Sequence, residues 1–318
     1  MGYLGLVFMN PKITVILPTR NEENKIGRCL DAIYSQTILP FEVIVVDGHS
    51  TDNTEKNAKR YPIRFFYEDY RTRSGACQIG IMNSKGEFIA FTDADCIPKN
   101  DWLENLLKGF DEGIVGIGGG IKNVGEGLWE KSINKAMSTF IGSANSIQGR
   151  FFKDKRFVKS ISGCNSMYRK KDLMNVGGFN VLSPGAEDAE LNRKLLAKGK
   201  LLYNPEALVI HHHSWTLKEY TKKMFRYGFE RGLIRAFDLQ VIPPFFALLV
   251  LLSLILTPYI FLASVLLYLL IILIFGIKSS YQEQNIRYLF SVPIVYIIEH
   301  SMYTLGMWKS VISKKRGA

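Results

Sequence analysis

Short apolar runs alternate with helix-like stretches through the first two thirds of the chain. Four runs, of which the third is the weakest, have the length and composition of buried strands: residues 13–17, 41–46, 63–67 and 88–91. After the first run, Ile26, Leu30 and Ile33 recur at helical spacing, and Asn21 is the predicted N-cap of that helix. A second helix is predicted from residue 71 to about residue 84. This alternation predicts an α/β fold with a doubly wound, largely parallel sheet.

The last third of the chain has the pattern of a membrane region. Residues 239–277 form a run of 39 positions without a charged side chain. As one straight helix this run would be about 58 Å long, nearly twice the roughly 30 Å core of a bilayer. A break at Thr257-Pro258 therefore predicts two spans, at about 239–257 and 259–277.

Two further segments are predicted to contact the membrane without crossing it. Residues 216–238 mix lysine and arginine with aromatic side chains, which predicts a basic amphipathic helix at the interface. Residues 289–308 are apolar but include Glu299 and His300, and charge at mid-span is costly. This third helix therefore either packs the two polar side chains inward or lies at the interface, and both termini are expected in the cytoplasm.

Composition and charge agree with a membrane partner. The 318 residues are 47% hydrophobic with a net charge of +11, and the stretch from Thr216 onward contributes 12 basic and 5 acidic residues. Basic residues around an apolar tail favour an anionic membrane surface, and no basic pattern typical of nucleic-acid binding is present. The four cysteines have no CxxC spacing, which predicts reduced cytosolic thiols and neither a zinc site nor a disulfide framework. The N-terminal stretch lacks a basic region before its short apolar run, so no secretory signal is predicted.

Two carboxylates, Asp93 and Asp95, follow the predicted strand at residues 88–91. Ligands bind at the carboxyl edge of an open α/β sheet, and side chains two positions apart on an extended chain point the same way. We therefore expect both acids to converge on a hard divalent ion that also contacts substrate phosphates. The alternative is a solvated loop that happens to contain two acids.

The usual glycine-rich nucleotide motifs are absent. Neither a G-x-G-x-x-G turn nor a Walker A sequence is present, and the glycines at 116 and 118–120 miss that spacing. A bound nucleotide would have to be held in another way.

Three stretches in order, residues 18–23 (PTRNEE), 45–54 (VVDGHSTDNT) and 91–95 (FTDAD), resemble the opening signatures of the family 2 glycosyltransferases of GT-A fold. The resemblance covers about residues 11–215. It implies a Mg²⁺ or Mn²⁺ ion held by Asp93 and Asp95, with Asp95 the more direct ligand. It also implies a set of nucleotide-binding residues: Pro18, Thr19, Arg20, Glu22, Asp47, Asp93 and either Arg71 or Arg73, of which Arg73 is selected.

The resemblance implies an acceptor side as well. A glycine-rich turn would lie under the acceptor sugar through Gly163, Cys164 and Asn165, with Glu187 beside it. Asp188 would be the general base, because a sugar hydroxyl is a poor nucleophile that must lose its proton as it attacks. Without the resemblance, residues 163–165 read equally well as an ordinary turn before a helix. Glu187 and Asp188 then read as acids at a helix N-terminus, where they interact favourably with the helix dipole.

Three consecutive histidines follow the predicted strand at residues 207–210. Alternation places His211 and His213 on one face and His212 on the other. By analogy with the family, one of them is a candidate third metal ligand or hydrogen-bond donor to the pyrophosphate, for which His213 is selected, and the alternative is a plain strand end.

These observations predict a cytosolic GT-A catalytic domain at residues 1–215, an interfacial helix at 216–238 and a membrane domain at 239–318. The expected reaction is inverting transfer of a sugar from a nucleotide-diphosphate donor to a lipid-linked acceptor held at the membrane. One alternative is a polyprenyl- or dolichyl-phosphate sugar synthase, whose acceptor is already an anion and has less need of Asp188. Another is a non-catalytic nucleotide-sugar-binding membrane protein.

Overall fold

The computed structural model describes residues 11–144, 146–147, 149–182, 185–213, 215–234 and 239–314. The prediction that the N-terminal stretch is not a secretory signal falls on residues outside this description, as does the expected cytoplasmic location of the C-terminal residues 315–318. The chain forms two compact units. The N-terminal unit contains the chain up to Lys122 and Phe151–His212, and the C-terminal unit contains Asn123–Arg150 and the chain from His213.

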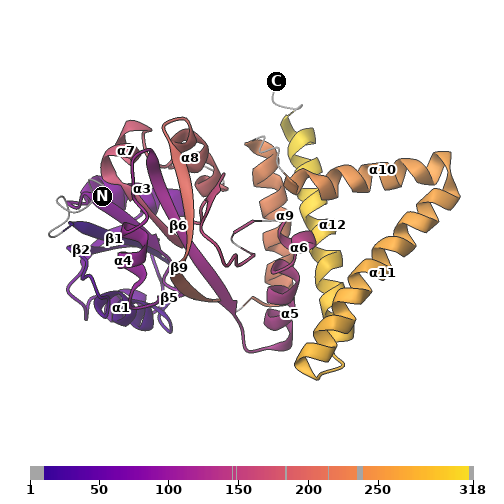
Figure 1. Cartoon of the computed structure of the whole chain (residues 1–318), viewed down its shortest axis with the longest axis horizontal. Coiled ribbons are helices and arrows are strands. Elements are labelled where there is room, and N and C mark those ends of the chain that lie inside the picture. The colour runs from indigo at the N-terminus through magenta and orange to yellow at the C-terminus, as the bar shows by residue number, and fades with distance from the viewer. Residues whose placement is uncertain are drawn as a thin grey trace. The chain divides into compact units, whose positions relative to one another are not determined.

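A mixed sheet forms the centre of the N-terminal unit, with strand order β3-β2-β1-β4-β8-β6-β9-β5 and β7 paired with β9. The first strands are parallel, β1 with β2 and β4, and β2 with β3, whereas β8 joins β4 and β6 in antiparallel pairs. The strands are β1 Ile13–Thr19, β2 Glu42–Asp47, β3 Arg64–Tyr67, β4 Phe88–Thr92, β5 Cys96–Pro98, β6 Ile114–Val124, β7 Arg156–Val158, β8 Asn165–Arg169 and β9 Lys200–His212. The predicted α/β class with a Rossmann-like parallel half is confirmed (Figure 1).

Helices pack on this sheet through apolar faces that share a core with its buried strands. Every residue of β1 is buried, and α1 places Ile26, Leu30 and Ile33 in the same core. The helices of this unit are α1 Ile26–Tyr34, α2 Thr54–Ala58, α3 Arg73–Asn83, α4 Trp102–Leu107, α7 Lys170–Asn175 and α8 Glu187–Leu196. The predicted cap is wrong: α1 begins only at Ile26, and Asn21 adopts a left-handed φ of 55° while its side chain accepts a hydrogen bond from the Thr51 N–H.

The C-terminal unit is helical. Its helices are α5 Leu128–Met137, α6 Phe140–Ser143, α9 Leu217–Leu233, the 3₁₀ turn η2 Leu239–Val241, α10 Ile242–Leu256, α11 Pro258–Glu283 and α12 Tyr288–Lys314. Helix α5 places Ile133 and Ala136 in one apolar core with α9 and α12. By packing, residues 123–150 therefore belong with the C-terminal unit, although the sequence-based division placed them in the catalytic domain.

Helices α9 and α12 approach each other at glycines. A Cβ at Gly228 would lie 1.9 Å from the Tyr303 carbonyl oxygen, and one at Gly306 would lie 2.0 Å from that of Phe225. Gly228 and Gly232 are four residues apart on one face of α9, the spacing that permits close helix contact. Helix α9 begins where predicted, with Thr216 as its N-cap.

Two helical stretches, Leu239–Leu256 (η2 with α10) and α11, are long and apolar enough to cross a membrane. Only 6% and 11% of their most apolar 18-residue stretches are buried, which distinguishes them from the core helices of a soluble protein. The predicted break falls between them at Thr257, and α11 continues six residues past the predicted end, to Glu283. In α12, Glu299 is buried and the His300 ring bonds the Ile141 carbonyl and the Tyr268 hydroxyl, so both side chains pack inward.

Candidate functional site

A cleft of about 300 Å³ opens at the carboxyl ends of the parallel strands. It is built where β1, β2 and β4 end, which is the edge where open α/β sheets bind ligands. Most of the residues selected from the sequence line it: Pro18, Thr19, Arg20, Glu22, Arg71, Arg73, Asp93 and Asp95. The residues selected from the sequence therefore lie around one cleft, and their roles in binding stay predictions.

The loops after β1 and β2 hold each other in place beside the cleft. Asp47 is 1% exposed, and its carboxylate accepts hydrogen bonds from the Ser50 N–H at 2.7 Å and the Ser50 hydroxyl at 2.5 Å. The Ser50 hydroxyl oxygen in turn accepts from the Asn21 N–H at 2.8 Å. Asp47 thus shapes the loop, and its neighbour Gly48 lines the cleft.

Arg73 joins three carboxylates at the start of α3. Its Nη2 and Nε lie 2.7 and 3.1 Å from Asp93 Oδ1, and its Nη1 lies 3.5 Å from Glu187 Oε1 and 3.4 Å from Asp188 Oδ1. Burial alone would lower the pKa of Arg73, but the surrounding carboxylates, led by Asp93, raise it well above its usual value. The fixed positive charge therefore ties the end of β4 to the first turn of α8.

Asp188 is a buried carboxylate whose protonation is shifted by its surroundings. Its Oδ2 accepts a hydrogen bond from the Gly163 N–H at 2.8 Å. Burial raises the pKa of Asp188 to about 7, opposed by Arg73 and by the Gly163 N–H and reinforced by Glu187. A carboxylate with a pKa near neutrality is well matched to accepting a proton near pH 7.

Gly163 makes this contact possible because it has no side chain. A Cβ there would lie 2.4 Å from Asp188 Oδ1 and 2.6 Å from Arg73 Nη1. The predicted role of Gly163 was acceptor binding, and the structure gives it a positioning role toward Asp188. Glu187, also predicted on the acceptor side, lies beside Arg73.

Two other residues of the predicted acceptor turn are structural, which corrects the sequence-based selection. Asn165 is fully buried: its amide donates to the Gly120 and Ala207 carbonyls and accepts from Trp102 Nε1, each at 2.8 Å. Cys164 is 8% exposed and lies against the Ser162 hydroxyl at 3.3 Å. Their side chains hold the sheet together and present little or no surface to an acceptor.

Glu68 is a cleft residue that the sequence analysis missed. Its side chain is 2% exposed, and one carboxylate oxygen accepts from the Thr72 N–H at 3.1 Å. The other oxygen is buried and has no hydrogen-bond partner among the described residues. An isolated acid after the weakest strand carries no sequence signal, so only the fold places it at the cleft.

The two acids after β4 have different partners, and the extended geometry assumed for them is not observed. Strand β4 ends at Thr92, and Asp93 begins a turn closed by the Cys96 N–H bonding the Asp93 carbonyl at 3.0 Å. Because the chain is not extended there, Asp93 bonds Arg73, whereas Asp95 Oδ2 lies 3.2 Å from His211 Nε2.

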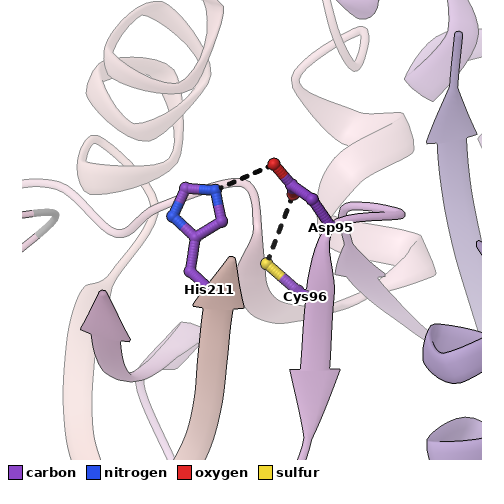
Figure 2. Close-up of side chains that lie close together, drawn as sticks. All are labelled: Asp95, Cys96 and His211. Carbon is purple, nitrogen blue, oxygen red and sulfur yellow. Dashed lines mark hydrogen bonds and ion pairs between the residues drawn. The ribbon is translucent and has the colours of Figure 1, made fainter. Parts of the chain in front are cut away.

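Asp95, Cys96 and His211 form the candidate metal centre, with ligand atoms all within 4.8 Å of one another (Figure 2). Burial would lower the pKa of His211, but its hydrogen bond to Asp95 raises it to about 9. Carboxylate and imidazole are suitable ligands for Mn²⁺ and similar ions once the imidazole has lost its proton.

The histidine selected from the sequence lies elsewhere. The Nε2 atom of His213 is 2.5 Å from the Asn134 Oδ1 atom, and its ring stacks on Trp215 with centroids 4.1 Å apart. His213 belongs to the C-terminal unit and His211 to the N-terminal unit. The histidine at Asp95 is therefore His211, two residues before the predicted one.

Known proteins of similar sequence and of similar fold are glycosyltransferases. The family model described as glycosyl transferase family 2 matches residues 14–177. A dolichyl N-acetyl-alpha-D-glucosaminyl phosphate 3-beta-D-2,3-diacetamido-2,3-dideoxy-beta-D-glucuronosyltransferase of Methanococcus voltae is 27% identical over 94% of this chain and 97% of its own length. Glycosyltransferase AglE of Haloferax volcanii is 28% identical over 72% of this chain and 75% of its own. The mannosyltransferase PcManGT from Pyrobaculum calidifontis, solved with GDP-Man and Mn²⁺, has the same fold, with a TM-score of 0.61 at 19% identity over 96% of this chain and 89% of its own.

Proposed function

Because this chain belongs to glycosyl transferase family 2 and has the GT-A fold, we propose that it transfers a sugar from a nucleotide-diphosphate donor to a lipid-linked acceptor with inversion. The observation that carries the proposal is the chain of contacts from the cleft through Arg73 to Asp188. It joins the cleft to a carboxylate that can accept a proton near pH 7.

The donor would lie along the carboxyl edge of the sheet. Strand order runs from β3 through β2 and β1 to β4, so Glu68 and Asp95 mark opposite ends of the cleft. We assign the diphosphate to the Asp95 end and the base to the end near Gly48 and Glu68. Arg20 and Arg71, which line the cleft, would contact the phosphates or ribose.

The proposed metal ligands are Asp95 and His211. Asp93 would instead position Arg73, to which it is hydrogen-bonded. The metal would neutralise charge on the diphosphate as the bond to the sugar breaks. The residues fit this use, because a carboxylate and an imidazole already lie 3.2 Å apart at the cleft.

Asp188 would act as the general base. It would take the proton of the acceptor hydroxyl as that oxygen attacks the anomeric carbon, while the nucleotide leaves from the opposite face. The Gly163 N–H and Arg73 fix the orientation of the carboxylate for this step.

A lipid-linked acceptor fits the C-terminal unit. Helices α10 and α11 provide two candidate spans, and the relative from Methanococcus voltae is named for a dolichyl-phosphate-linked acceptor. A lipid-linked acceptor would be confined to the membrane surface, where an enzyme anchored in the same membrane encounters it at high effective concentration.

The proposed topology is a helical hairpin with the catalytic unit in the cytoplasm. Lys135 of α5 pairs with Glu283 at the end of α11 at 3.0 Å, and α5, of ten residues, is too short to cross. The end of α11 therefore lies on the same side as α5. A single cysteine placed at Gly317 in a thiol-free background should resist an impermeant reagent in intact cells, whereas ready labelling would favour three crossings.

The reaction is tested on the full-length protein in two stages. A thermal-shift screen of UDP-, GDP- and dTDP-sugars with Mg²⁺ or Mn²⁺ identifies the donor, because a ligand of the folded state raises its stability. Transfer is then measured to a dolichyl-phosphate-linked sugar and, separately, to dolichyl phosphate, and product anomers are assigned by NMR. Product of retained configuration, or no turnover and no donor hydrolysis, would contradict the proposal.

One variant separates the alternatives. Asp188→Asn keeps the side-chain size but removes basicity, and loss of a general base costs about 10²–10⁴ in rate. Transfer to a sugar hydroxyl should fall by that factor with donor binding retained. An activity confined to dolichyl phosphate and insensitive to Asp188→Asn would identify a lipid-phosphate sugar synthase instead.

A further inference from the structure

We propose that Cys96 is a ligand of the metal held by Asp95 and His211, which makes this centre a mixed oxygen, nitrogen and sulfur site. Such a site favours borderline-soft ions such as Zn²⁺ and Co²⁺ over Mg²⁺. The inference rests on the proposed metal dependence and deepens it by naming a further ligand and the class of ion selected.

The sheet places the sulfur opposite the imidazole. Strand β5 runs antiparallel to β9, and Cys96 and His211 are direct partners in that register. Side chains directly opposite in an antiparallel pair lie on the same face, with Cβ atoms about 4.5–5.5 Å apart. Strand pairing therefore positions both Cys96 and His211. The His212 N–H also donates a hydrogen bond to the Asp95 carbonyl at 2.9 Å, which fixes the backbone of the third residue.

The distances match ligands around one four-coordinate ion. With typical metal–ligand bonds, a tetrahedral ion would hold S and O about 3.6 Å apart and N and O about 3.4 Å apart. Cys96 Sγ lies 3.8 Å from Asp95 Oδ1, and His211 Nε2 lies 3.2 Å from Asp95 Oδ2. Figure 2 shows the sulfur and the imidazole nitrogen both directed at the Asp95 carboxylate. The two contacts reach different oxygens of the same carboxylate, and one ligand atom from each residue lies within 4.8 Å of the others, so reorientation of the Asp95 carboxylate would bring sulfur, nitrogen and oxygen onto one ion.

The neighbouring acid does not complete an all-oxygen site. Asp93 bonds Arg73 at 2.7 Å, so the hard-ligand pair expected from the sequence is not assembled around Asp95. A thiolate in its place changes the preference, because sulfur ligands select softer metals while carboxylates and water suit Mg²⁺. Cysteine spacing along the chain gave no sign of this, since the ligands meet only through the β5–β9 register.

The test is cobalt absorption on the metal-free full-length protein in detergent, with Co²⁺ alone as the probe. A thiolate bound to Co²⁺ produces a near-ultraviolet charge-transfer band that oxygen and nitrogen ligands do not. We expect this band in the parent, its loss in Cys96→Ser and its retention in Cys164→Ser, the matched control with a neighbouring buried thiol. Cys96→Ser should weaken Zn²⁺ and Co²⁺ binding at least about tenfold, because even residues that only hydrogen-bond a metal ligand change metal affinity by about 10- to 100-fold. Mg²⁺ binding should weaken far less.

The outcomes separate the two proposals. Co²⁺ that binds without the band, or a band lost only in Cys164→Ser, overturns the Cys96 ligand and leaves the metal site standing. Failure of the parent to bind Co²⁺ overturns both. A variant in which Cys96 is the only remaining cysteine must keep the band, which decides the question even if Cys96→Ser folds poorly.

Discussion

Replacing Gly163 with alanine tests the geometry around Asp188 directly. A Cβ there would lie 2.4 Å from Asp188 Oδ1 and 2.6 and 2.8 Å from the two Arg73 Nη atoms, so the carboxylate and the guanidinium must move. The backbone of Gly163 is outside the left-handed region, so alanine adds no backbone strain of its own. The displaced carboxylate would lose its 2.8 Å hydrogen bond from the Gly163 N–H.

The magnitude follows from that bond. A hydrogen bond to a charged group contributes about 1.5–3 kcal/mol, and about 1.4 kcal/mol is a factor of ten in rate. Gly163→Ala should therefore lower kcat for transfer to a hydroxyl acceptor by about 10- to 150-fold. The assay is initial-rate transfer at saturating donor, with donor affinity measured by calorimetry, which should change much less.

The control is Gly27→Ala on α1, where the nearest atom to a new Cβ is the Tyr61 hydroxyl at 3.7 Å. This variant should keep the parental rate. A Gly163→Ala protein with parental rate and unchanged Tm would refute the idea that the Gly163–Asp188 contact matters for turnover. If its Tm instead falls below the assay temperature, Asp188→Asn still tests whether the carboxylate is needed for turnover, without a steric change.

Three further predictions follow from the two units. Because Asp188 must be deprotonated to act as a base and burial raises its pKa to about 7, kcat/KM should rise with pH through about 7, and this limb should be absent from the residual activity of Asp188→Asn; a flat parental profile would contradict the assignment. Asn165→Leu should lower stability by at least about 1–3 kcal/mol, since the Trp102 indole N–H and two carbonyls lose their partner, and a parental denaturant midpoint would show that the amide is dispensable. Gly228→Leu should lower Tm in detergent more than Gly27→Ala does, because its Cβ would meet the Tyr303 carbonyl at 1.9 Å; an unchanged Tm would mean that α9 and α12 can separate without cost.

The strands and the cleft could be predicted from the sequence because both depend on short local patterns. The run that became β1 is buried along its whole length, and a buried parallel strand must be apolar. Pro18 lies near the end of that strand and Arg20 follows it directly, so both line the cleft. Such neighbours in sequence are neighbours in space, so the motif located them.

The remainder depended on contacts between distant segments. Alternation places His211 and His213 on one face, and only the pairing of Cys96 with His211 decides which of them meets Asp95. Asn165 resembled an exposed turn residue because its three partners come from positions far along the chain. No local pattern carries that information.

The excursion of residues 123–150 into the helical unit affects how the chain can be made and shortened. Ile133 and Ala136 share their core with helices that are synthesised later, so α5 would emerge from the ribosome before these partners. A protein cut after residue 215 would keep α5 but lose α9 and α12, leaving an apolar face that favours aggregation. A soluble form of the N-terminal unit would require excision of this excursion too, with a short linker joining Lys122 to Phe151.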